Sequence, residues 1–194
     1  MATSPPLTLN QKVLIWARGK LGQQVGRGEC WDLGESALSH AGAQTSNDLG
    51  PVGDDEDYIW GDPVSDLGDV QPGDLLQIRD HVATTTTQKD YEWDDGSTES
   101  ETATVTAERG HHTAIVVSAL DAKGQFRTLE QHVKPLGKRV QNKVLPTTDQ
   151  DPVVSWSKVK RKNPSTGKVE TAKVTTTVTV TVTGTIWAYH PKAK

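Results

Sequence analysis

One cysteine stands where a thiol can become a nucleophile. Cys30 is the only cysteine of the 194 residues, and it follows the glycine-rich segment 22–29 at the start of a stretch with helical spacing. The free N–H groups and the positive dipole end of a helix favour a thiolate over a thiol. The flanking Gly28 and Asp32 favour an edge position over burial in a helix face. The pattern therefore predicts a reactive cysteine, which needs a cationic neighbour because Glu29 opposes ionisation.

Histidine can supply that cation, and two candidates share one face of a predicted hairpin. The strand predicted over 125–133 folds back on the preceding one, so that His112 falls opposite His132. Because side chains alternate along a strand, Glu130 lies on the same face as both histidines. A base that is oriented by a second polar group is the arrangement that activates a nucleophile. We therefore expect Cys30, His112, Glu130 and His132 to form a catalytic set.

The elements that must position these side chains are two helices followed by strands. Apolar spacing predicts helices over 10–21 and 30–41, each followed by a glycine. Alternating Val and Thr residues predict strands in the remainder, with an inserted hairpin at about 81–108 and a C-terminal hairpin at about 153–183. Helices followed by an antiparallel meander form an α+β layout. We expect one domain over 1–194, with the N-terminal helices packed on an antiparallel β-sheet.

Composition and charge argue against several classes of protein. The net charge of −4 disfavours a nucleic-acid binder. The one basic run, 158–162, would bind a polyanion or form the solvated side of a hairpin, and we favour the second. No signal peptide and no membrane span is visible, and no cofactor is indicated. We expect a soluble monomer, with its compartment unknown.

Four short motifs, in the same order along the chain, resemble those of the CHAP and NlpC/P60 families of papain-like cysteine amidases and endopeptidases. They are Gly28-Glu-Cys-Trp-Asp32, Gln71-Pro-Gly-Asp74, His112-Thr-Ala-Ile-Val116 and Leu129-Glu-Gln-His132. The resemblance implies a papain-like fold, with a helix carrying Cys30 against a sheet carrying His112. It also implies cleavage of amide bonds, commonly peptide or N-acetylmuramoyl amide bonds of peptidoglycan. Glu130 and His132 would then be the pair that supports His112.

The sequence departs from these families in part. His132 stands where an asparagine is usual, and the two long hairpins either shape the substrate groove or are solvated decorations. Gln24 lies six residues before Cys30, the spacing at which papain-like peptidases place a glutamine that stabilises the oxyanion. The backbone N–H of Cys30 is the second candidate donor. Asp32 either caps nearby backbone or takes a direct part in the chemistry.

Three alternatives stay open from the sequence alone. The side chains of Cys30, His112, Glu130 and His132 are all acceptable zinc ligands, although the chain lacks paired Cys-x-x-Cys or His-x-x-x-His spacing. A catalytically inactive papain-like module would use the same fold for binding. An acyltransferase would use the same nucleophile and pass the acyl group to an acceptor other than water.

Overall fold

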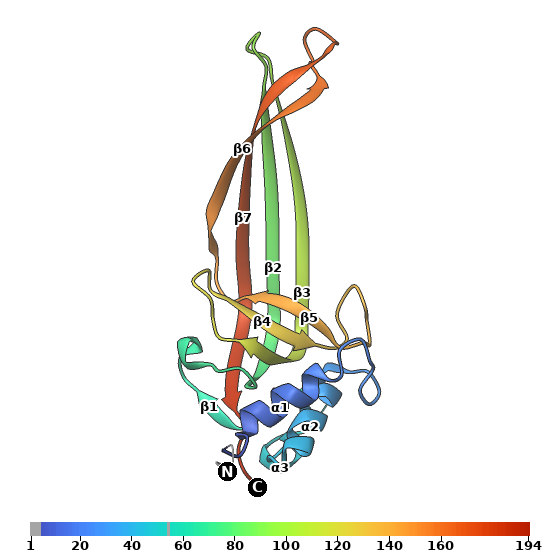
Figure 1. Cartoon of the computed structure of the whole chain (residues 1–194), viewed down its shortest axis with the longest axis vertical. Helices are drawn as coiled ribbons and strands as arrows, with labels where there is room; N and C mark the ends of the chain where they lie inside the picture. Colours follow the sequence, from blue (N-terminus) through green and yellow to red (C-terminus); the bar gives the residue numbers. More distant parts are fainter. Residues whose placement is uncertain (1–4, 54) are drawn as a thin grey trace. The chain divides into compact units, whose positions relative to one another are not determined.

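A computed structural model describes residues 5–53 and 55–194, and the chain forms two compact units (Figure 1). Unit 1 contains the chain up to His81 together with Arg109–Thr147 and Thr183–Lys194, and unit 2 contains Val82–Glu108 and Thr148–Val182. Each unit is described by itself below. Unit 1 carries the candidate site.

The α-helices of the described part of unit 1 are α1 (Leu9–Arg18), α2 (Cys30–Ala41) and the short α3 (Ser46–Leu49). The side chain of Thr8 accepts a hydrogen bond from the backbone N–H of Gln11, and the side chain of Gln11 accepts one from the backbone N–H of Thr8. This reciprocal pair is a strong start signal for a helix. No helix among the described residues has the length and apolar content that crossing a bilayer requires.

The strands form a seven-stranded sheet with the order β1-β7-β2-β3-β4-β5, and β6 pairs with β7. Their bounds, with the 3-10 helix η1 (Leu67–Asp69), are β1 (Asp62–Val64), β2 (Leu75–Glu92), β3 (Thr98–Ser118), β4 (Gln125–Glu130), β5 (Gln141–Pro146), β6 (Gln150–Lys162) and β7 (Val169–His190). The pairs β1–β7, β3–β4, β4–β5 and β6–β7 are antiparallel. Figure 1 shows α1 and α2 beside the β4 and β5 end of the unit 1 sheet.

Two apolar clusters cover opposite faces of the unit 1 sheet. Ile115 and Leu129 are register partners in β3 and β4, and both pack in a cluster with the apolar faces of α1 and α2. The next residue along β3, Val116, belongs to the second cluster together with Phe126. Because side chains alternate along a strand, this division follows directly from the sequence. Each fully buried large apolar side chain stabilises the fold by roughly 1.5–3 kcal/mol, so the ends of β3 and β4 are held firmly against α2.

Unit 2 contains only strand segments and has a small core of its own. Tyr91 from β2 and Trp93, the first residue after β2, pack with Ala172 and Val174 from β7. The guanidinium of Arg161 lies 4.3 Å from the centroid of the Tyr91 ring. Arg161 also forms ion pairs with Glu99 and Glu101. Arg161 is therefore paired with both an aromatic ring and carboxylates on this face of unit 2.

The expected fold class is confirmed at the level of a mostly antiparallel sheet with few helices. The helix predicted over 30–41 coincides with α2, whereas the first predicted helix ends earlier, at Arg18. The strand predicted over 125–133 is too long, because β4 ends at Glu130. His132 lies beyond that end with a φ of 66°. Because β4 ends before His132, this histidine does not take the predicted position opposite His112.

Candidate functional site

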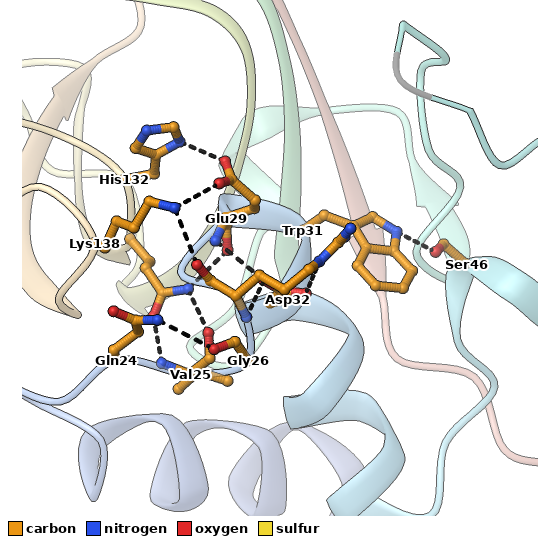
Figure 2. Close-up of polar contacts among 11 residues, drawn as sticks. Gln24, Val25, Gly26, Glu29, Trp31, Asp32, Ser46, His132 and Lys138 are labelled. Carbon is orange, nitrogen blue, oxygen red and sulfur yellow. Dashed lines mark hydrogen bonds and ion pairs between the residues drawn. The ribbon is translucent and has the colours of Figure 1, made fainter.

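Cys30 is the first residue of α2, and a tightly fixed loop precedes it. Gly28 has a φ of 93°, and a Cβ at this position would meet the side chain of Lys138 at 2.7 Å. The buried carboxylate of Asp32 accepts hydrogen bonds from the backbone N–H groups of Arg27 and Glu29, at 2.8 and 3.1 Å (Figure 2). Asp32 thus has the capping role that the sequence left open beside a direct one. The loop holds the partly exposed thiol at a defined place at the helix start.

The surroundings of the thiol favour its ionised form. Burial raises the pKa of Cys30, but the hydrogen bond and the charge of His112 lower it, and so do hydrogen bonds with the backbone of Thr113 and Trp31. The lowering contributions prevail, and the pKa of Cys30 lies below its ordinary value. A histidine beside a cysteine at a helix N-terminus is the environment in which thiolates form near neutral pH. The cationic neighbour that the sequence required is therefore His112.

His112 lies in β3, almost fully buried, between the thiol and a carboxylate. Its Nε2 atom is 3.2 Å from Oε2 of Glu130, which is an ion-pair distance without the alignment of a good hydrogen bond. Burial lowers the pKa of His112, but the contacts with Cys30 and Glu130 outweigh that effect and raise this pKa to about 9. The imidazole is therefore held as an imidazolium at neutral pH. A thiolate and an imidazolium stabilise each other in this position.

Glu130 is the fixed end of this chain of contacts. Its carboxylate binds the guanidinium of Arg109 through two hydrogen bonds of 2.7 and 3.1 Å and accepts a third, of 2.6 Å, from the hydroxyl of Thr128. The side chains of Arg109 and Glu130 are 3% and 0% exposed, so water does not weaken the pair. Burial raises the pKa of Glu130, but His112 and Arg109 together lower it to about 2. The carboxylate stays charged and correctly oriented.

Gln131 joins the end of β4 to the loop before Cys30. Its side chain is fully buried and accepts a hydrogen bond of 2.8 Å from the N–H of Val25. It also donates to the carbonyl oxygens of Val25 and Glu29, at 3.0 and 2.7 Å. One amide group thus spans the two segments that carry the thiol and the carboxylate. Gln131 positions the site without touching the sulfur.

The structure brings Cys30, His112 and Glu130 together, but it does not bring His132 to them. His132 is half exposed, and its Nδ1 atom lies 2.6 Å from Oε2 of Glu29 (Figure 2). Glu29 also pairs with Lys138 at 3.3 Å. The expected position opposite His112 required a strand that continues to residue 133, and β4 ends too early for that. His132 and Lys138 instead both lie against the carboxylate that stands directly before the cysteine.

Gln24, the expected oxyanion donor, is bonded within its own loop. Its side chain is exposed, and its Nε2 donates to the carbonyl oxygen of Gly26 at 3.3 Å (Figure 2). The backbone N–H of Cys30 lies in the first turn of α2, where N–H groups lack partners within the helix. The second candidate from the sequence is thus available without a rearrangement. The oxyanion role of either donor stays a prediction.

Arg109 and Gln131 are the site residues that sequence reasoning missed. Regular alternation puts residues three apart on opposite faces of a strand, yet Arg109 and His112 both reach Glu130. The alternation is therefore broken between them, and Gly110 is the one signal for this in the sequence. Gln131 was overlooked because strand parity selected its two neighbours, Glu130 and His132, as the candidates. Because its parity is opposite to that of Glu130, its side chain points to the helix side of the sheet.

The arrangement suits nucleophilic chemistry better than metal binding. Among residues 5–53 and 55–194, no group of three or more His, Cys, Asp or Glu side chains is arranged to hold a metal ion. The zinc set considered from the sequence loses a member because His132 lies at Glu29. What remains is a thiol, a protonated imidazole and a buried carboxylate in contact, which is the order of groups in an activated nucleophile.

Comparison with known proteins agrees with this geometry. The family model of the AIM3/BBC1 cysteine proteinase-fold domain matches residues 7–146, which include every residue of the site. The protein "Altered inheritance of mitochondria protein 3" from Debaryomyces hansenii is 37% identical over 75 residues, covering 34% of this chain and 8% of the relative. The chain thus spans less than a tenth of that relative's length.

No solved structure matches the chain. The cysteine proteinase fold that the resemblance implied is supported, but the bacterial CHAP and NlpC/P60 families are not where the match lies. With the match extending over most of its length, the chain belongs to the family of AIM3/BBC1 cysteine proteinase-fold domains.

Proposed function

We propose that this domain is a thiol hydrolase that cleaves amide bonds, with Cys30 as nucleophile, His112 as general acid and base, and Glu130 as the group that orients His112. The observation that carries the proposal is the row of contacts from Cys30 to His112 and from His112 to the buried Glu130, and the pKa shifts of the first two groups agree with it. The pKa of Cys30 is lowered and that of His112 is raised to about 9. Each shift favours the charged form of its group, and a thiolate beside an imidazolium is the resting state of this proposal.

The first half of the reaction follows from this resting state. The sulfur of Cys30 attacks the carbonyl carbon of the substrate, and the carbonyl oxygen becomes an oxyanion. The backbone N–H of Cys30 is the proposed donor to that oxyanion. His112 then gives its proton to the leaving nitrogen, the C–N bond breaks, and the acyl group stays on the sulfur as a thioester. Glu130 keeps the imidazole in the orientation that both steps need.

The second half regenerates the enzyme. His112, now neutral, accepts a proton from a water molecule, and the resulting hydroxide attacks the thioester carbonyl. The C–S bond breaks and releases the acid, leaving the thiolate and the imidazolium. An acceptor other than water would turn the same steps into acyl transfer. Arg109 stays outside the proton transfers, and its buried charge keeps Glu130 ionised throughout.

A peptide amide is the substrate class we propose. Peptidoglycan was implied by the CHAP resemblance, and the family match gives that substrate no support. A catalytically inactive binding module is the competing function for the same fold. The buried Arg109–Glu130 pair argues against this alternative, because a binding module has no need to hold an imidazole against a thiol at the cost of burying charges.

The test is the rate of alkylation of Cys30 by iodoacetamide as a function of pH. We expect a fast reaction well below the ordinary thiol pKa of about 8.5, and a shift to higher pH in the His112→Ala variant. His132→Ala is the matched control, because it removes a histidine near Cys30 that does not contact the imidazole. Equal profiles in all three proteins would rule out the proposal. Peptide and peptidoglycan fragments are then screened with Cys30→Ala as the blank.

A further inference from the structure

One face of β6 in unit 2 presents an aromatic side chain and lysines to solvent. Trp156, Lys158 and Lys160 are two residues apart, so their side chains share a face of the strand. Trp156 is 72% exposed, and both lysines are exposed. Across the β6–β7 pairing, Lys158 stands directly opposite Lys173, which is exposed as well. We call the four residues the β6 basic face.

The opposite face of the same two strands is already filled. Val159 pairs with Ala172, and Ala172 packs into the small core with Tyr91 and Trp93. Arg161 stacks on Tyr91 on that side and has carboxylate partners. Unit 2 therefore satisfies its aromatic and basic groups on one face and leaves them uncovered on the other. The exposed Trp156 with the lysines beside it forms an aromatic and basic surface that no other part of unit 2 covers.

The charges of the β6 basic face have no internal counterpart. Among the described residues, no carboxylate lies at ion-pair distance from Lys158, Lys160 or Lys173. Like charges directly opposite each other in a sheet destabilise it, so Lys158 and Lys173 repel one another across the strands. A partner that brings carboxylates to this face would remove that repulsion. The face is thus complementary to negative charge.

The backbone of β6 offers a second means of binding. In the described sheet, β6 is hydrogen-bonded to β7 and to no other strand. Its outer edge therefore carries unpaired N–H and C=O groups over a strand of 13 residues. An open strand edge is a template on which an extended chain can add as a further strand. The side chains of such a chain would point alternately to the same two faces of the sheet as those of β6.

We propose that β6 is a docking edge for an extended acidic segment of another protein, which adds to the sheet as a strand. On this geometry the segment carries acidic residues at two alternate positions, facing Lys158 and Lys160. An apolar residue two positions further lies beside Trp156. This inference is independent of the proposed hydrolase, because no residue of the β6 basic face belongs to the site around Cys30.

A protein segment fits these observations better than a nucleic acid does. A nucleic acid would use the lysines and the tryptophan but not the strand edge, because it has no peptide groups to pair with. The chain as a whole has a net charge of −4, which repels an extended polyanion. A short acidic peptide carries its charge only where the lysines stand. Backbone hydrogen bonds to the strand edge then provide affinity for the peptide, and the alternation of its side chains provides specificity for its sequence.

The test measures fluorescence anisotropy of a labelled peptide of about ten residues with acidic residues at alternate positions and one apolar neighbour. We expect the full chain to bind it with an affinity that falls about tenfold or more in Lys158→Glu/Lys160→Glu. Trp156→Ala weakens binding separately. The matched control is Lys12→Glu/Lys123→Glu, which changes the net charge equally at exposed lysines of unit 1 and leaves binding within about twofold.

Two further probes separate strand addition from simple charge attraction. An isomeric peptide with adjacent acidic residues directs its charges to opposite faces, and a peptide with N-methylated backbone amides cannot pair with the edge. We expect both to bind at least about tenfold more weakly. Equal binding of either probe, or tighter binding of a single-stranded oligonucleotide of the same charge, would overturn the proposal. Binding by Cys30→Ala at the level of the parent chain is expected, which keeps this outcome separate from that of the hydrolase.

Discussion

Two histidine–glutamate pairs lie near Cys30, and they behave differently although their components are the same. His112 and Glu130 are buried, and Glu130 also forms an ion pair with Arg109. His132 and Glu29 are partly exposed, and Glu29 also forms an ion pair with Lys138. The exposed pair is the closer one, at 2.6 Å against 3.2 Å. Distance therefore does not single out the pair that we propose to be functional. The exclusion of water distinguishes the two pairs, because two charges interact more strongly where water does not reach them.

The largest difference is expected when each glutamate is neutralised. Glu130→Gln leaves the guanidinium of Arg109 buried without a counter-charge, and we expect a loss of about 3–5 kcal/mol in the free energy of unfolding. Glu29→Gln acts on an exposed pair, and we expect a loss of less than about 1 kcal/mol. Urea denaturation of both variants measures the contrast. Similar losses would mean that burial does not distinguish the two pairs.

The acid dependence of stability sharpens the same contrast. The pKa of Glu130 is about 2 in the folded chain and about 4.3 when unfolded, so its contribution is complete above pH ~4.3 and is lost as the pH falls toward 2. The amount is on the order of 3 kcal/mol. The unfolding free energy of the parent chain minus that of Glu130→Gln should therefore shrink over this range.

Gln131 gives a prediction of intermediate size. Gln131→Leu breaks three hydrogen bonds, two of them buried and one partly buried. We expect it to cost about 1–3 kcal/mol of stability and to slow the alkylation of Cys30 at neutral pH. Gln24→Leu is the matched control, since Gln24 is exposed and bonded only within its own loop. An unchanged alkylation rate in Gln131→Leu would show that the loop holds the thiol without help from β4.

The smallest effect is expected from salt. Exposed ion pairs are screened by salt, and each contributes less than about 1 kcal/mol. The stability difference between the parent chain and His132→Ala should therefore be small and should vanish at high ionic strength. The difference for Glu130→Gln should persist there, because its partners are out of contact with water. Loss of both differences in high salt would remove the distinction between the pairs.

The sequence was sufficient for those features that depend on short-range patterns. The helix at 30–41, the thiol at its start and the histidine in the following sheet all follow from local spacing, and they are where the structure has them. The parity argument also placed Glu130 on the side of His112. These inferences need only the period of a helix or a strand.

The rest depended on where regular structure stops. His132 was misplaced because nothing local shows that β4 ends at Glu130. Arg109 was missed because the alternation of β3 is broken next to Gly110, and a period of two assigns it to the wrong face. The contacts of Gln131 join segments more than 100 residues apart, which no spacing rule can pair. A family name based on four short motifs likewise needed comparison over the whole domain.

The three hydrogen bonds of Gln131 also have a consequence for motion. Because one buried amide group holds both the loop before Cys30 and the end of the strand that carries Glu130, thermal displacement of one segment carries the other along. The sulfur of Cys30 and the carboxylate of Glu130 then move together, and the distance between them stays nearly constant during fluctuations of the loop. The N–H of Val25 donates to this amide. Its exchange with deuterium would therefore report directly how often the thiol and its partners separate.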